Sequence, residues 1–268
     1  MNHLRRELAP VTARAWQLLD QAAAEALRPA LAARRLVQVD GPHGWTHAAA
    51  SLGRTARIAV EPAAGVRGRR RLVQPLVELR APFAVDLDLI DDAERGDDGP
   101  DLADLEGAAR QLALAENVCV FHGYDDAGIT GLTQASPHDP IDLGADLGAY
   151  PRHVARAVAV LRQAGVDGPY GLALGPDTYT GVLETAERGA GLLLVDHLRR
   201  ILGGPVVRAP GVEGGVLLSI RGGDFHLHLG ADLSLGYARH DDTAVHLYLE
   251  ESCTFTVASP EAAIALPA

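Results

Sequence analysis

The chain contains no lysine, because all 24 of its basic residues are arginine. This absence excludes Schiff-base chemistry, a lysine general base and any lysine isopeptide cross-link. Cysteine is scarce as well: Cys119 and Cys253 are far apart in the sequence, and their spacing fits no zinc or redox motif. We expect two buried thiols, as is usual in a reducing cytoplasm.

Long apolar runs and an excess of positive charge are also missing. No run reaches the roughly 18 apolar residues of a membrane span, and the N-terminal segment lacks the apolar core of a signal peptide. The net charge of −11 argues against nucleic acid as the main partner, because phosphate binding needs concentrated positive charge. With 268 residues, 47% of them hydrophobic, the chain is predicted to be a soluble globular protein.

The usual catalytic motifs are absent too. The sequence has no GxSxG elbow, HExxH pair, P-loop or dinucleotide fingerprint. The glycine-rich run GVEGG, residues 211–215, precedes an expected strand and not a helix, so we expect no phosphate site there. Composition and motif spacing therefore indicate no catalytic residue, no cofactor and no particular enzyme.

Two histidines in the run FHLHL invite a metal-site interpretation. His226 and His228 alternate with apolar residues, however, and a period of two places both on one face of a strand. The later run AVHLYLEES has the same pattern, so two half-buried strands account for both without a metal. The alternative is a metal-dependent hydrolase in which His240, Asp241 or Asp242 supplies a third ligand.

The remaining pattern predicts a mixed α/β protein. Residues 12–35 carry an apolar stripe typical of a helix, with Thr12 as N-cap and Pro29 near its end. Residues 101–123 form the longest expected helix. Further helices and a buried strand follow up to about residue 222, and the closing section is rich in strands.

Residues 50–76 form two extended, polar segments around the turn EPAAGV. Four arginines lie near the turn, and a hairpin with so little apolar surface is not stable alone. Three interpretations stay open, namely an arm that lies on another subunit, an intramolecular hairpin and an anion site. The arginines concerned are Arg67, Arg69, Arg70 and Arg71.

An acidic segment follows the hairpin. Residues 86–106 contain ten carboxylates and one arginine. Their spacing is not that of an EF-hand, so we predict a solvated acidic surface with a turn at IDDAERG.

Several segments, in order, resemble the encapsulins, a family of shell proteins related to the major capsid proteins of tailed phages. They are LRRELAPVTARAW, AARRLVQVDGPHGW, ELRAPFAVD, IDDAERG, GVDGPY, RGGDFHLHLGADLSLGY and LYLEESCTFTV. The resemblance implies an α+β, capsid-protein-like fold with a peripheral domain, an axial domain and an extension loop. The implied ranges are 1–49 and 77–130 for the peripheral domain, 50–76 for the extension loop, 131–222 for the axial domain, and 223–268 for the C-terminal strands of the peripheral domain.

The resemblance also implies a function. Encapsulins are non-catalytic shells in the cytoplasm, and about sixty copies, or a multiple, close into an icosahedral compartment. They enclose a cargo enzyme, such as a dye-decolorising peroxidase or a ferritin-like protein, through its C-terminal targeting peptide. The alternative is a prophage-type capsid protein that packages DNA.

Two sets of residues follow from the resemblance. The cargo-peptide groove would contain Leu27, Leu31, Leu233, Leu235, Tyr237 and Val245, with Arg34 as a polar neighbour. The loop at the five-fold pore would contain Glu187, Arg188, Gly189, Ala190, Gly191, Leu192, Leu193 and Leu194.

The sequence departs from the family pattern at three places. Gln38 stands where many relatives have aspartate, and the loop ERGAGLLLVDH lacks their Gly-Tyr-Pro. Some relatives stack a flavin on a tryptophan after the segment that matches ELR; the corresponding run here is VDLDLID, so we expect no flavin.

Overall fold

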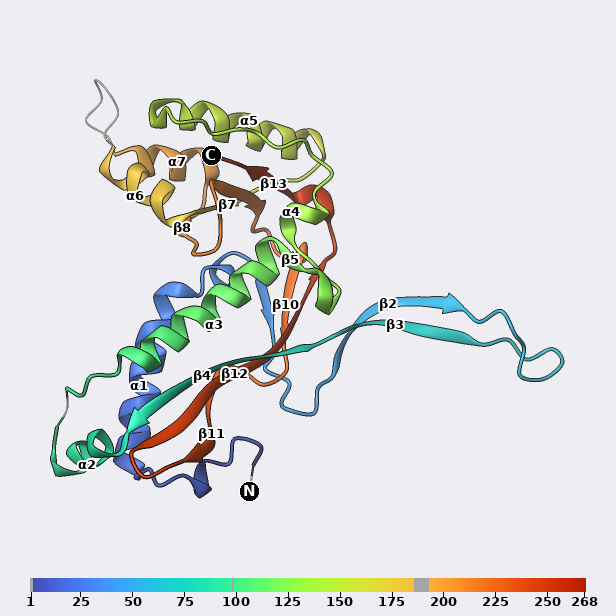
Figure 1. Ribbon diagram of the computed structural model, residues 1–268. Coiled ribbons are helices and arrows are strands. Elements are labelled where there is room, and N and C mark those ends of the chain that lie inside the picture. Colours follow the sequence, from blue (N-terminus) through green and yellow to red (C-terminus); the bar gives the residue numbers. More distant parts are fainter. Residues whose placement is uncertain (1, 98, 186–192) are drawn as a thin grey trace.

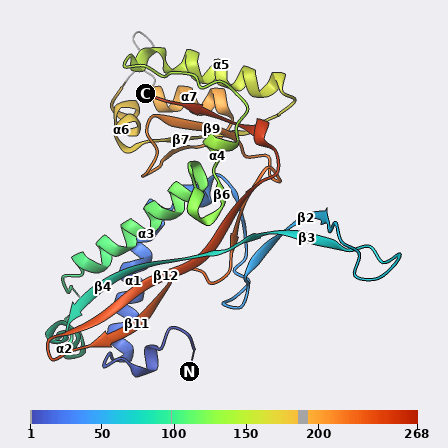
Figure 2. The same cartoon turned by 45° about the vertical axis from the view of Figure 1, so that its right-hand side comes forward.

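The computed structural model describes residues 2–97, 99–185 and 193–268. It shows two lobes, one above the other, and a long hairpin that projects sideways from the junction between them (Figure 1). Turning the molecule by 45° leaves this arrangement unchanged, so the hairpin stands clear of both lobes (Figure 2).

The lower lobe is built on a sheet whose central strand is β12 (Ala244–Val257). Along one edge β12 pairs antiparallel with β4 (Val77–Asp86), in register Val245 with Val85. Along its other edge it pairs first with β11 (Ser234–His240) and then with β10 (Phe225–Leu229). The short strand β1 (Gln38–Asp40) runs parallel to β10.

Two long helices cover this sheet. In α1 (Ala13–Ala30) the Thr12 side chain accepts the first-turn N–H of Ala15, as the sequence predicts, and the helix ends directly after Pro29. The apolar stripe of α1 packs with α3 (Ala103–Phe121) and the sheet into one core. The residues of this core on α1 include Trp16, Leu19, Ala23 and Leu27.

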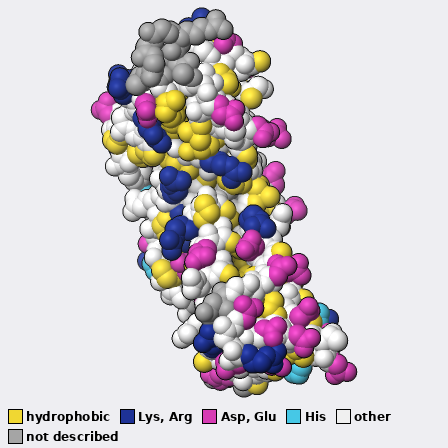
Figure 3. All heavy atoms as spheres, turned by 90° about the vertical axis from the view of Figure 1, so that its left-hand side faces the viewer, with side chains coloured by type: hydrophobic (Ala, Val, Ile, Leu, Met, Phe, Trp, Pro, Cys, Tyr) yellow, Lys and Arg dark blue, Asp and Glu magenta, His cyan; other side chains and the backbone are white. Residues whose placement is uncertain are grey.

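A helix that the sequence analysis missed lies between β4 and α3. The expected turn is instead α2 (Leu87–Arg95), which buries Ile90 and Ala93 and ends at Gly96 in the left-handed conformation. Apolar residues at intervals of three indicate a helix here, but the many aspartates between them suggested a turn. The described acidic side chains of residues 86–106 are exposed, and Figure 3 shows acidic side chains gathered at this lower end of the molecule.

The upper lobe holds a second sheet, of strand order β13-β9-β7-β8, with helices packed against it. Its central strand β7 is buried along its whole length. The strands are β7 (Tyr170–Leu174), β8 (Val206–Arg208), β9 (Gly215–Ser219) and β13 (Ala263–Leu266), and the helices are α4 (Leu132–Ala135), α5 (Tyr150–Gln163), α6 (Pro176–Glu184) and α7 (Leu194–Leu202). A small hairpin, β5 (Gly123–Tyr124) with β6 (Ile129–Thr130), connects α3 to this lobe. Because β13 pairs with β9, the C-terminal segment 223–268 contributes to both sheets.

The projecting hairpin, which we call the arm, consists of β2 (Ala49–Arg57), β3 (Arg69–Pro75) and the loop between them. It does not fold back onto its own lobes, so the interpretation as an intramolecular hairpin was wrong. Its apolar side chains are unusually exposed: Ile58 and Val66 are each 52% exposed and Val60 is 77% exposed. Such a surface needs a partner.

The histidine strands follow the predicted alternation only in part. In β10 the three apolar residues are buried, while His226 and His228 are half-buried on the other face. In β12 the prediction of a half-buried strand fails, because Tyr248 and Glu250 are buried as well. The strand has neighbours on both edges, and residues 247–255 are covered on both faces.

Candidate functional site

A groove of about 520 Å³ lies between α1 and the beginning of β11. One wall comes from α1 and the residues after it, through Leu27 and Leu31, and the other from Leu233 and Leu235. Leu4 and Arg6 of the N-terminal segment line it as well. The groove thus combines apolar side chains with charged ones, which are Arg6, Asp20, Arg28, Arg34 and Asp232.

Five of the seven predicted groove residues lie here, and two do not. Leu27, Leu31, Arg34, Leu233 and Leu235 line the groove. Tyr237 is 8% exposed and its hydroxyl lies 2.6 Å from Nδ1 of His240, outside the groove lining. Val245 is fully buried in the lower core.

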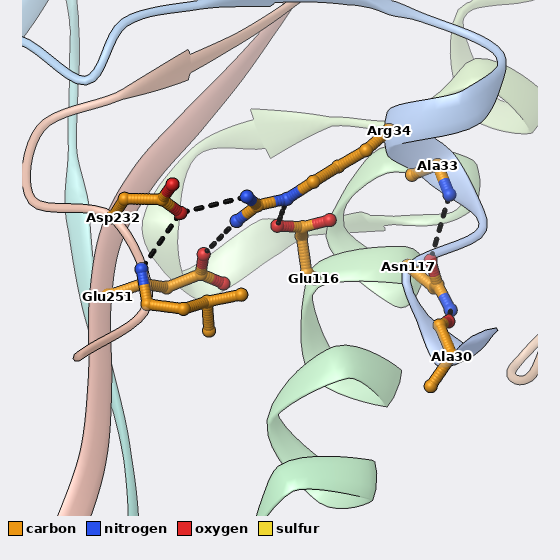
Figure 4. Close-up of polar contacts among 8 residues, drawn as sticks. Ala30, Ala33, Arg34, Glu116, Asn117, Asp232 and Glu251 are labelled. Carbon is orange, nitrogen blue, oxygen red and sulfur yellow. Dashed lines mark hydrogen bonds and ion pairs between the residues drawn. The ribbon is translucent and has the colours of Figure 1, made fainter. Parts of the chain in front are cut away.

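Arg34 lines the groove and binds three carboxyl groups from three segments of the chain (Figure 4). Its Nε donates to Glu116 of α3 at 2.6 Å, and its Nη2 donates to Glu251 of β12 at 2.9 Å. Its Nη1 donates to Asp232 at 2.8 Å, and Asp232 in turn accepts the N–H of Leu233. Arg34 is therefore a positioning residue that fixes the turn leading into β11.

The two glutamates of this cluster are fully buried. Burial raises the pKa of Glu116, although Arg34 opposes the shift, and it raises the pKa of Glu251 further, with the neighbouring Glu116 adding to it. Each has one oxygen with no hydrogen-bond partner in the described chain. One guanidinium cannot neutralise three carboxylates, so the cluster favours the protonated form of the glutamate pair more than water does.

This cluster makes stability depend on pH. A carboxyl group whose folded-state pKa is raised stabilises the fold fully below its unfolded pKa, and the stabilisation is lost as the pH rises through the folded value. We expect the wild-type protein to lose stability on going from about pH 5 to about pH 9, and Glu251→Gln to lose less, because the amide stays neutral. Denaturant midpoints measured across this range test it; equal slopes for both proteins would contradict it.

Asn117 is a buried residue that the sequence analysis passed over. Its Oδ1 accepts the N–H of Ala33 at 3.0 Å, and its Nδ2 donates to the carbonyls of Ala30 and Pro210 at 2.8 and 3.1 Å. It thereby holds the end of α1 beside Arg34 (Figure 4). The polar pair EN inside the apolar run LALAENVCVF was the signal for both Glu116 and Asn117.

The other predicted sites fare differently. Residues 187–192 of the predicted pore loop lie outside the described residues, Leu193 is 48% exposed, and Leu194 is buried in the upper core.

In the part of the chain that is described, no three histidine, cysteine or acidic side chains converge as metal ligands. His226 pairs with Thr256 and His240 with Val245, at opposite ends of β12, so the sheet keeps them apart. Of the described helices, none is long and apolar enough to cross a membrane.

Comparison with solved structures defines the class. A virus-like particle from Pyrococcus furiosus matches with a TM-score of 0.64 at 16% identity, over 94% of this chain and 98% of that one. The capsid of an empty GTA particle matches with a TM-score of 0.55 at 15% identity, over 89% and 90%. The fold is that of the tailed-phage-type capsid proteins, as predicted.

Sequence comparison then identifies the family. Residues 1–254 match the family described as "Encapsulating protein for peroxidase". Type 1 encapsulin shell proteins of Rhodospirillum rubrum and Mycobacterium tuberculosis are 47% and 41% identical to this chain, over 99% of it and 96% and 99% of their own lengths. The chain belongs to the encapsulin family of shell proteins, which are structural proteins and not enzymes.

Proposed function

We propose that this chain closes into an icosahedral shell in the cytoplasm, from about sixty copies or a multiple, that encloses a cargo enzyme. The near-full-length identity to type 1 encapsulin shell proteins carries the proposal. The projecting arm supports it, because its exposed apolar and arginine side chains need a second copy to cover them.

The proposed parts of the shell follow the predicted ranges except at β13, which belongs to the sheet of the upper lobe. The lower lobe is the peripheral domain, the arm is the extension loop, and the upper lobe is the axial domain that meets its copies at the symmetry axes. The loop around Glu187–Leu194 lines the five-fold pore. The four arginines of the arm lie against a neighbouring subunit.

The groove is the proposed docking site for the C-terminal peptide of the cargo. Its leucines offer apolar pockets of the kind that peptide recognition uses, and many equivalent grooves on one wall raise the effective concentration. The family description names a peroxidase as the enclosed protein, so a dye-decolorising peroxidase is the first cargo to test, and a ferritin-like protein the second.

Co-expression tests the function directly. The shell protein is produced with the dye-decolorising peroxidase of the same organism, or with its ferritin-like protein, and particles are purified by size. We expect closed particles in negative-stain images that contain the enzyme, and empty particles when its last residues are removed. A 28.2 kDa species without particles would contradict the shell proposal. Equal loading of the intact and the truncated cargo enzyme would contradict the docking proposal.

Replacing Leu233 with aspartate is expected to empty the groove of cargo. The substitution places a charge where an apolar side chain of the peptide would be buried, so the amount of cargo per shell should fall at least about tenfold. Leu8→Asp is the matched control, because Leu8 is 50% exposed and does not line the groove. Cargo enzyme activity per particle is the measurement; unchanged loading in Leu233→Asp would contradict the placement.

The two other functions considered find little support. A capsid that packages DNA needs a basic inner wall, and the net charge of −11 disfavours one. A metal-dependent hydrolase would need His226, His228 and His240 together, and the sheet separates them.

A further inference from the structure

The strand β11 is an edge of the lower sheet, and the N-terminal segment covers only part of that edge. β12 pairs with β11 on one side. On the opposite side, the N–H of Tyr237 donates to the carbonyl of Leu4 at 2.8 Å. The chain thus already uses this edge for one backbone hydrogen bond, to the carbonyl of a turn residue in its N-terminal segment.

The register determines which other backbone groups face the same way. Since the N–H of Tyr237 points away from β12, Tyr237 and Leu247 form a non-hydrogen-bonded pair of the antiparallel ladder. The pairs alternate, so Leu235 and Leu249, two residues back in an unbroken register, are also such a pair. The N–H and C=O of Leu235 therefore point outward from the sheet, and no described group outside the sheet bonds to either.

This free position lies within the groove. Ser234 and Leu235 line it on one side, and α1 lines it on the other. The turn before β11 is fixed, because Arg34 holds Asp232 and Asp232 accepts the N–H of Leu233. A free strand edge beside a helix surface that offers apolar side chains is an arrangement in which proteins bind an extended peptide as an added strand.

We propose that the cargo peptide, bound in the groove as proposed above, adds a strand to β11 through the N–H and C=O of Leu235. Alternate side chains of the peptide then face the leucines of α1, and the others face the interior of the shell. The partner is thus an extended segment with apolar residues at every second position. Leu4 marks where the added strand must end, because the N-terminal segment occupies the edge from Tyr237 onward.

Hydrogen exchange at single-residue resolution tests the proposal. The probe is a fluorescent protein with a C-terminal tail in which serine and leucine alternate over seven residues, co-expressed with the full-length shell protein. Purified loaded shells are compared with shells made beside the same protein without the tail. We expect exchange of the Leu235 amide to slow at least about tenfold, whereas Ser234 and Gly236, bonded to β12, and Tyr237, bonded to Leu4, stay unchanged.

Proline substitutions in the tail provide a second readout that leaves the shell untouched. Each proline removes one N–H, so only the position that donates to the carbonyl of Leu235 should lose loading, and its neighbours should keep it. Three results would each overturn the proposal: loaded shells with unchanged exchange at Leu235, a proline series in which no single position is more sensitive than its neighbours, or no loading of the tail. The docking proposal itself is decided separately, by loading of the native cargo enzyme.

Discussion

Arg34→Met is expected to lower the free energy of unfolding by about 3–5 kcal/mol, because it leaves two buried glutamate side chains without the guanidinium that they share. Glu116 and Glu251 are both fully buried, and Arg34 is their shared partner at 2.6 and 2.9 Å. The substitution also frees Asp232, so the turn into β11 loses its anchor. Denaturant unfolding followed by tryptophan fluorescence measures the loss.

Arg35→Met is the matched control for this prediction. Arg35 is the adjacent residue but is exposed, so its loss should change stability by less than about 0.5 kcal/mol. Adding Glu116→Gln and Glu251→Gln to Arg34→Met should restore part of the stability, since amides can be buried without a counter-charge. Equal effects of the Arg34 and Arg35 substitutions would show that the cluster is not the anchor we infer.

Reversing the charge of the arm is expected to abolish closed particles. Arg69, Arg70 and Arg71 lie on a strand that stands clear of its own lobes, while each copy also carries an acidic surface around α2. Three glutamates in their place would turn an attraction between copies into a repulsion of like charges. Size-exclusion chromatography and negative-stain images should show small, folded species only.

The corresponding lysine triple variant separates charge from fold. It keeps the positive charge and should still form particles, although the planar contacts of arginine are lost. Circular dichroism of both triple variants checks that the subunit still folds, which is expected because the arm contributes little to either core. Normal particles from the glutamate variant would show that the arginines do not carry the contact between copies.

The sequence indicated the long helices well and the central sheet less well. The stripe of α1 and the span of α3 have the helical period and clear ends, so local pattern was sufficient there. The helix α2 was missed because its apolar stripe is short and its aspartates resemble a loop. Tyr248 and Glu250 were misplaced because alternation cannot show that β12 is covered on both faces.

For the groove, too, the sequence predicted some features and missed others. Sequence resemblance brought Leu27, Leu31, Leu233 and Leu235 to one place, and the structure agrees. It did not reveal that Arg34 is committed to three carboxylates of its own subunit, because these partners come from three distant segments. Ion pairs between segments so far apart leave no periodic signal in one sequence.

Asn117 has a consequence for shells of different size. One amide side chain connects the end of α1 and η2 (Ala33–Arg35) with the carbonyl of Pro210 in the upper lobe. The two lobes are thus linked at this point by a buried, hydrogen-bonded side chain. By contrast, the arm is attached near its base by bonds such as that between Gln74 and the carbonyl of Gly128. We therefore expect a change of curvature between particles of different diameter to be taken up where the arm leaves the lobes more readily than between the lobes.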